Sequence, residues 1–506
     1  MKRTAWVTST PLASSLVAAT LACGPSGPAS TPPPDVVDVP GADESQVAVW
    51  PDEAFRNQRP EPGPAPELRV PKVERFTLSN GLEVYFLAVE TLPVAHFVLD
   101  FELGSLDDPR GKAGTTDLCM DLLDESTKAL DKSAHKARLD DEALSLSSWS
   151  GSETSGLSGQ SLARDFPSLM KVTAELLQTP GLRADDFERL QDRAVDGLAQ
   201  VRASHASVAS RVLPSLVYGA SHPRGRIVDE SQLEKVRVSD CAKVAKRLGP
   251  KGARLFVAAK MSRQELESTL EAELGAWKGS APKAKAAKTP DPELRHVFFV
   301  DMPGSVQSTV AVASLGPDLD APDYAATQIM TRILGGSFSS RINMNLREDK
   351  GYTYGGRGTF RYHRDGSHLW AGAGVRADAT VPSIEEVLKE IAGVREGPLR
   401  PEELSRERDG ARAALPGEFG APAQNLSTFR WLVDNGLPLD WHVQYDAALG
   451  ALDLDAVETA GRDHLPVDDY LVLVVGDGQV VRADLEAFAS SRGLQFVEID
   501  SDGKRK

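Results

Sequence analysis

The most restrictive feature of this 506-residue sequence is an internal repeat. Residues 281–292, which are rich in Ala, Lys and Pro, separate two blocks, 70–280 and 293–500. Each block opens with strand-like segments, continues with helical patterns, and closes with a helix, a strand and a helix. The closing segments are 238–248, 253–259 and 263–277 in the first block and 453–464, 470–475 and 482–490 in the second. The repeat predicts two homologous lobes joined by an exposed linker.

The opening of the first block predicts a β-hairpin. Two strand-like segments, 74–78 and 82–86, enclose Asn80-Gly81, a dipeptide typical of tight turns between strands. Further strands are predicted over 95–103, 297–300 and 308–314. Long helical patterns follow the strands without a regular alternation of strand and helix. This order favours an α+β fold for each lobe.

Charge and cysteine content limit the partners and the covalent links. The net charge is −16, whereas a nucleic-acid partner requires a basic surface, so no such partner is expected. Three cysteines, Cys23, Cys119 and Cys241, are too few for a disulfide framework. Cys119 and Cys241 lie in segments with apolar periodicity, and we interpret them as two buried free thiols. A disulfide between them in an oxidising compartment is the alternative.

The N-terminus predicts an export signal. Lys2 and Arg3 precede a short apolar stretch, residues 11–22, which suits a signal peptide and is too short to span a membrane. The sequence Thr20-Leu21-Ala22-Cys23-Gly24 resembles a bacterial lipoprotein signal, although Thr20 stands where Leu is usual. We therefore predict a signal over 1–23, lipidation of Cys23, a Pro-rich tether over 24–69, and anchoring to the periplasmic side of the outer membrane. An ordinary cleaved signal peptide is the alternative.

Five short segments occur in a fixed order: Asn80-Gly81-Leu82, 104–109 and 218–223 in the first lobe, and 334–341 and 346–354 in the second. This ordered series resembles the insulinase/pitrilysin family of zinc peptidases in its short two-lobe form. The resemblance implies that each lobe is a mostly antiparallel sheet packed with helices. It also implies that the two lobes, followed by a tail over 501–506, form half of a clam-shell.

The zinc motif of that family is degenerate in this chain. Active relatives carry His-x-x-Glu-His on the first helix of the first lobe, where two histidines bind zinc and the glutamate activates water. Here Gly114 and Leu118 stand at the histidine positions and Asp117 at the glutamate position. The later helix, 187–198, has no glutamate near the expected third ligand. We predict no metal and no cofactor in this chain, with zinc in a partner.

No other histidine pair replaces the motif. None of the nine histidines are spaced three or four residues apart, the helical spacing that lets two rings share a metal. His363 and His368 flank a predicted hairpin turn and are expected to project from opposite faces of the strands. An incidental polar hairpin is the favoured interpretation of these two residues.

The second lobe keeps two residues that the resemblance assigns to substrate binding. Arg347 and Tyr354 match an arginine and a tyrosine with which the family grips substrate across its cleft. Both side chains donate hydrogen bonds and suit a peptide carbonyl or a developing oxyanion. The alternative is structural, with Arg347 ending a helix and Tyr354 packing at the start of a strand. Gly335-Gly336 is interpreted as a turn between helices.

The combination of an empty first lobe and a preserved second lobe predicts a non-catalytic subunit. Such a subunit would hold peptide substrates for a zinc-bearing insulinase-family sibling in the bacterial envelope. Two alternatives remain: a binding or scaffold protein with no role in hydrolysis, and an active zinc metalloendopeptidase with atypical ligands.

Overall fold

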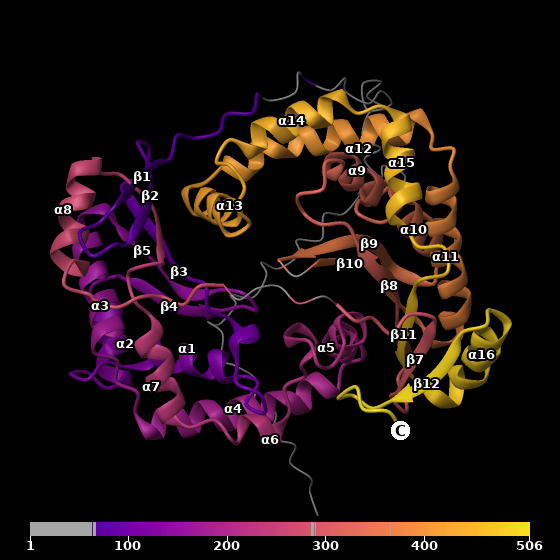
Figure 1. Ribbon diagram of the computed structural model, residues 1–506, viewed down its shortest axis with the longest axis horizontal. Coiled ribbons are helices and arrows are strands. Elements are labelled where there is room, and N and C mark those ends of the chain that lie inside the picture. The colour runs from indigo at the N-terminus through magenta and orange to yellow at the C-terminus, as the bar shows by residue number, and fades with distance from the viewer. Residues whose placement is uncertain (1–62, 64–66, 285–287, 289, 365) are drawn as a thin grey trace, which may run out of the picture. The chain divides into compact units, whose positions relative to one another are not determined.

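The computed structural model describes residues 63, 67–284, 288, 290–364 and 366–506. The predicted signal peptide, Cys23 and most of the predicted tether lie outside the described residues. Residues 65–506 form one compact unit, and all that follows concerns this unit. It contains two six-stranded sheets with helices packed on them (Figure 1).

The first sheet is built from residues before the linker. Its strand order is β1 (Glu74–Thr77), β2 (Glu83–Ala88), β6 (Arg254–Ala259), β3 (Val94–Phe101), β5 (Ser155–Leu162) and β4 (Ser145–Ser150). Only β2 and β6 run parallel, and every other neighbouring pair is antiparallel. The Asn80-Gly81 turn joins β1 to β2, as predicted.

The second sheet repeats this order. Its strands are β12 (Gln495–Ile499), β7 (His296–Asp301), β11 (Leu471–Gly476), β8 (Gln307–Gly316), β10 (Gly366–Arg376) and β9 (Thr353–His363). The core strands β7, β11, β8, β10 and β9 match β2, β6, β3, β5 and β4 in order and direction. The outer strand differs, because β12 comes from the end of the chain and pairs in parallel with β7. The prediction of two homologous α+β lobes is confirmed.

The helices fall into two matching groups. The first lobe has α1 (Thr115–Glu125), α2 (Lys132–Asp141), α3 (Phe166–Gln178), α4 (Ala184–Arg202), α5 (His205–Tyr218), α6 (Glu230–Leu233), α7 (Val238–Arg247) and α8 (Arg263–Leu274). The second has α9 (Tyr324–Leu334), α10 (Arg341–Asn343), α11 (Thr380–Glu396), α12 (Pro401–Ala414), α13 (Pro422–Asp434), α14 (Trp441–Ala451), α15 (Leu454–His464) and α16 (Gly478–Ser491). Short helical turns are η2 (Ser105–Asp107), η3 (Ala163–Asp165), η4 (Pro223–Gly225), η5 (Met344–Asp349), η6 (Ala377–Ala379) and η7 (Leu415–Phe419). In the described part of the chain, no helix combines the length and apolar character needed to cross a bilayer.

The central strands β6 and β11 are buried on both faces, and one face of each sheet contacts a helix of the other lobe. In β6, Leu255 and Val257 face the helices of the first lobe, whereas Phe256 on the opposite face packs against α13 of the second. In the second sheet, Leu471 and Leu473 likewise pack against α5 of the first lobe. Because side chains alternate between the faces of a strand, strands covered on both sides are apolar throughout. The two lobes are therefore joined by α5, which packs on the second sheet, and by α13, which packs on the first sheet.

Cys119 and Cys241 form a disulfide, so the interpretation of two free thiols was wrong. Each residue belongs to the apolar face of its helix, but α1 and α7 pack face to face. The two Cα atoms lie 4.7 Å apart although the cysteines are 122 positions apart in the sequence. Apolar periodicity identified the buried faces correctly and held no information about which two faces meet.

Candidate functional site

The degenerate motif lies at the start of α1, and its geometry does not fit zinc. Gly114 is the N-cap residue, with a left-handed backbone at φ 89°. A Cβ atom at this position would lie 2.6 Å from Cδ2 of Leu233. Leu118 is buried among the apolar side chains of the first lobe. The two histidine positions are therefore filled by a glycine with no room for a side chain and by a core leucine.

Asp117, at the glutamate position, does not complete a metal site. Its carboxylate is exposed and accepts a hydrogen bond from Ser150 at 2.8 Å. Asp192 and Asp196 on α4 are also exposed. Among the described residues, no three His, Cys, Asp or Glu side chains are arranged to hold a metal ion.

A buried carboxylate now organises the N-terminus of α1. Asp108 accepts hydrogen bonds from the backbone N–H groups of Gly114 (2.7 Å), Thr115 (3.1 Å) and Thr116 (2.9 Å), and from the Thr116 hydroxyl (2.7 Å). These are the donors that a helix N-terminus leaves unpaired. Burial raises the pKa of Asp108 to about 6, against the hydrogen bonds that favour its ionised form. Asp108 thus caps α1, the helix that carries the degenerate motif, and a search for metal ligands does not reveal this role.

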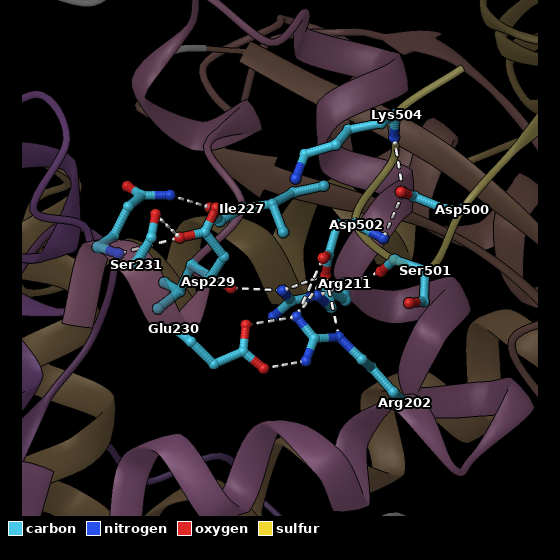
Figure 2. A network of polar contacts seen from close by, with 12 residues as sticks. Arg202, Arg211, Ile227, Asp229, Glu230, Ser231, Asp500, Ser501, Asp502 and Lys504 are labelled. Carbon is cyan, nitrogen blue, oxygen red and sulfur yellow. Dashed lines mark hydrogen bonds and ion pairs between the residues drawn. The ribbon is translucent and has the colours of Figure 1, made fainter. Parts of the chain in front are cut away.

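Residues 228–233 fill the space above Gly114, and a network of ion pairs and hydrogen bonds holds them in place (Figure 2). Val228 and Leu233 lie over Gly114. The carbonyl oxygen of Val228 accepts a hydrogen bond from Arg211 on α5. The Asp502 carboxylate contacts Arg211 at 2.7 Å and Arg202 on α4 at 3.0 Å. Through Asp502, the C-terminal residues therefore connect the second lobe to the segment of the first lobe that packs over Gly114.

One backbone donor on the outer edge of strand β4 is already hydrogen-bonded within the first lobe. Its backbone N–H at Ser148 donates to the Asp124 carboxylate of α1 at 2.5 Å. This N–H lies on the edge that no other strand of the sheet covers. A peptide added as a further strand would have to displace Asp124 to use this donor.

His363 and His368 lie on the same face of the β9–β10 hairpin, which corrects the expectation of opposite faces. His368 pairs across the hairpin with Arg361, two residues before His363, so all three project in one direction. The imidazole rings stack with centroids 5.9 Å apart, and Nδ1 of His368 lies 3.0 Å from the Tyr218 hydroxyl. Burial lowers the pKa of His368 to about 3, so its ring stays neutral.

The two predicted substrate-binding residues of the second lobe are both accessible. Arg347 lies on η5, with 41% of its side chain exposed, and pairs with its neighbour Glu348 at 3.2 Å. Tyr354 is 90% exposed, which contradicts the alternative that it packs into the lobe. The β9–β10 register shifts between Ala373 and Val375, so Tyr354 sits at a β-bulge. Bulges re-aim side chains beside functional sites, and here the bulge leaves the phenol in solvent.

Asn343 and Phe338 were not identified from the sequence as parts of this site. The Asn343 amide donates to the carbonyl of Phe338 at 2.7 Å and accepts from the N–H of Gly356 at 3.2 Å. It therefore links the turn after α9 to the strand that carries Tyr354. The Phe338 ring lies beneath the Arg347 guanidinium, at 5.0 Å from ring centroid to Cζ. The only sequence signal was an aromatic residue in a serine- and glycine-rich turn.

Comparison with known families decides the assignment of the fold. The family model described as insulinase (peptidase family M16) matches residues 87–227, and the model described as peptidase M16 inactive domain matches residues 244–410. The chain belongs to the insulinase family. The altered motif positions make it a degenerate, peptidase-like member of the insulinase family. No curated protein matches the sequence.

Solved structures share the insulinase fold at low sequence identity. A peptidase M16 inactive domain from Pseudomonas fluorescens is 21% identical, with a TM-score of 0.73, over 80% of this chain and 98% of that one. A protease from Helicobacter pylori is 17% identical, with a TM-score of 0.71, over 80% and 99%. The periplasmic protease PqqL from Escherichia coli is 14% identical, with a TM-score of 0.68, over 82% and 46%. These similarities establish the fold alone.

Proposed function

We propose that this chain is a non-catalytic insulinase-family subunit that holds extended peptides for a zinc-bearing partner of the same family. The contrast between its lobes carries the proposal. The two histidine positions of the first lobe hold Gly114 and Leu118, which cannot bind a metal, whereas Arg347 and Tyr354 of the second lobe are exposed. A guanidinium and a phenol both donate hydrogen bonds to a peptide carbonyl without any metal in the same chain. Zinc and the activated water would belong to the partner.

The hydrogen bonding at the outer edge of the first sheet supports the assignment of catalysis to the partner and substrate holding to this chain. Strand addition requires free backbone groups along a sheet edge. In this chain the Ser148 N–H is occupied by Asp124. We therefore assign strand addition to the partner and the gripping contacts to the second lobe of this chain.

We further propose that the protein works on the periplasmic side of the bacterial outer membrane, anchored through Cys23. The Cys119–Cys241 disulfide supports an oxidising compartment, because structural disulfides are rare in the reducing cytosol. The apolar N-terminal stretch before Cys23 supports export.

Peptide hydrolysis by a reconstituted pair tests the proposal. Residues 24–506 would be assayed alone and mixed with the zinc-bearing sibling. We expect no hydrolysis by the chain alone and a faster rate for the mixture than for the sibling. Arg347→Ala should remove this gain, and Tyr354→Phe, which deletes only the phenol oxygen, should reduce it.

Control variants and opposite outcomes make the assay decisive. Arg492, an exposed arginine after α16, serves as the matched control, because Arg492→Ala removes the same charge elsewhere. A sibling rate that never changes would favour a scaffold with no role in hydrolysis. Hydrolysis by the chain alone that a chelator stops would show atypical zinc ligands and overturn the proposal.

A further inference from the structure

Phe338 is an exposed aromatic side chain on a firmly anchored turn. It lies in the turn between α9 and α10, where Gly335 bridges to Gly358 of β9, and 65% of the residue is exposed. Solvent exposure forfeits the stabilisation that burying a phenyl ring provides. Burial in the core therefore does not account for the phenyl ring at this position.

A buried carboxylate fixes the turn on both sides of Phe338. Glu407 of α12 is 2% exposed and accepts hydrogen bonds from the hydroxyls of Ser337 (2.9 Å) and Ser339 (3.3 Å). The Asn343 side-chain amide donates a hydrogen bond to the Phe338 carbonyl oxygen at 2.7 Å. The backbone is thus restrained at the aromatic residue and at both its neighbours, while the ring itself projects outward.

The ring holds Arg347 without using its hydrogen-bond donors. The guanidinium carbon lies 5.0 Å from the ring centroid, within the range of a cation–π contact. A carboxylate partner would occupy the N–H groups of an arginine, whereas an aromatic face leaves their in-plane directions free. The Glu348 ion pair, with both side chains about two-fifths exposed, is screened by solvent and restrains Arg347 only weakly.

We propose that Phe338 is a positioning and specificity residue for the peptide grip of Arg347. Its ring orients the guanidinium toward a peptide carbonyl, and its exposed surface receives a bulky apolar side chain next to that carbonyl. The inference rests on the proposed function, since it assumes that Arg347 contacts peptide. It assigns the preferred ligand as an extended peptide with large apolar residues.

Fluorescence anisotropy with two labelled peptides separates orientation from apolar contact. One probe alternates Ser and Leu, and its matched probe has Ser at every Leu position. Phe338→Trp keeps both functions and should bind both probes as the unaltered chain does. Phe338→Leu keeps an apolar surface but loses the π face, so we expect about two- to fivefold weaker binding of both probes, equivalent to about 0.5–1 kcal/mol. Phe338→Ala should weaken the Leu-containing probe more than the Ser probe.

The variants also separate failure of this inference from failure of the proposed function. Arg347→Ala is measured on the same probes and in the mixed hydrolysis assay. If Arg347→Ala weakens binding while Phe338→Leu and Phe338→Ala bind as the unaltered chain does, the role of Phe338 is refuted and the proposed function stands. If Arg347→Ala changes neither binding nor the gain in hydrolysis, the proposed function itself fails. Thermal unfolding of each variant confirms that the surface substitutions leave the fold intact.

Discussion

The Arg254 guanidinium lies 2.7 Å from the Asp434 carboxyl group, and this contact joins the first sheet to α13 of the second lobe. The same guanidinium contacts Asp100, which lies opposite Arg254 across the β3–β6 pair. Glu102 approaches Arg254 at 3.6 Å, and Arg430 approaches Asp434 at 3.6 Å from the preceding turn of α13. Two largely buried carboxyls thus share one guanidinium at the contact between the lobes.

The stability of the protein should depend on pH through Asp434. Burial, with the Asp100 carboxyl beside it, raises the pKa of Asp434 to about 8. A carboxyl whose pKa is raised by folding stabilises the folded state fully below its unfolded pKa of about 3.9, and the contribution is lost as pH rises to the folded value. Asp434→Asn should therefore gain stability relative to the unaltered chain between pH 6 and pH 8, by up to about 1.4 kcal/mol per pH unit. Urea unfolding at both pH values measures the difference, and exposed Asp440→Asn is the control.

Removal of the disulfide should destabilise the first lobe without blocking its assembly. Cys119 and Cys241 are almost fully buried and close a loop of 122 residues. Replacing both by alanine should lower the free energy of unfolding by about 2–4 kcal/mol. Thermal unfolding with and without reductant measures this effect. Reductant should lower the melting temperature of the unaltered chain and leave that of the double variant unchanged.

Restoring the His-x-x-Glu-His sequence should not restore zinc binding. In a Gly114→His, Asp117→Glu, Leu118→His variant, the first ring would collide with Leu233 and the second would enter the apolar core. We expect no stoichiometric zinc by elemental analysis and a loss of about 2–5 kcal/mol of stability, since a core leucine is replaced by a polar ring. Stoichiometric zinc with an unchanged melting temperature would contradict the geometry described for α1.

The C-terminal residues should contribute measurable stability through Asp502. Its carboxylate pairs with Arg211, only 10% of whose side chain is exposed, and with Arg202. Asp502→Ala leaves these two guanidinium groups without this partner, and we expect a loss of about 1–3 kcal/mol. Chemical unfolding measures the loss, with exposed Asp468→Ala as the matched control. Equal stability of the two variants would show that the network in Figure 2 is only a surface feature.

The sequence was most informative where a local pattern corresponds to a local structure. The Asn80-Gly81 turn, the closing helix–strand–helix segments of both blocks, and the loss of ligands at Gly114 and Leu118 were all predictable. Each depends on residues close together in the chain or on the chemistry of one side chain. A glycine has no side chain to ligate a metal, whatever surrounds it.

Long-range packing decided what the sequence could not. The Cys119–Cys241 disulfide, the shared face of His363 and His368, and the Phe338–Arg347 contact each depend on how two segments meet in space. The alternation of apolar residues shows that a face is buried but does not identify the surface that buries it. The sequence by itself thus determined two α+β lobes and a first lobe whose two motif histidines are replaced by Gly114 and Leu118. Only the tertiary structure, by bringing together α1 with α7, α13 with the first sheet, and Asp502 with Arg211, decided how the lobes are joined and which side chains remain exposed.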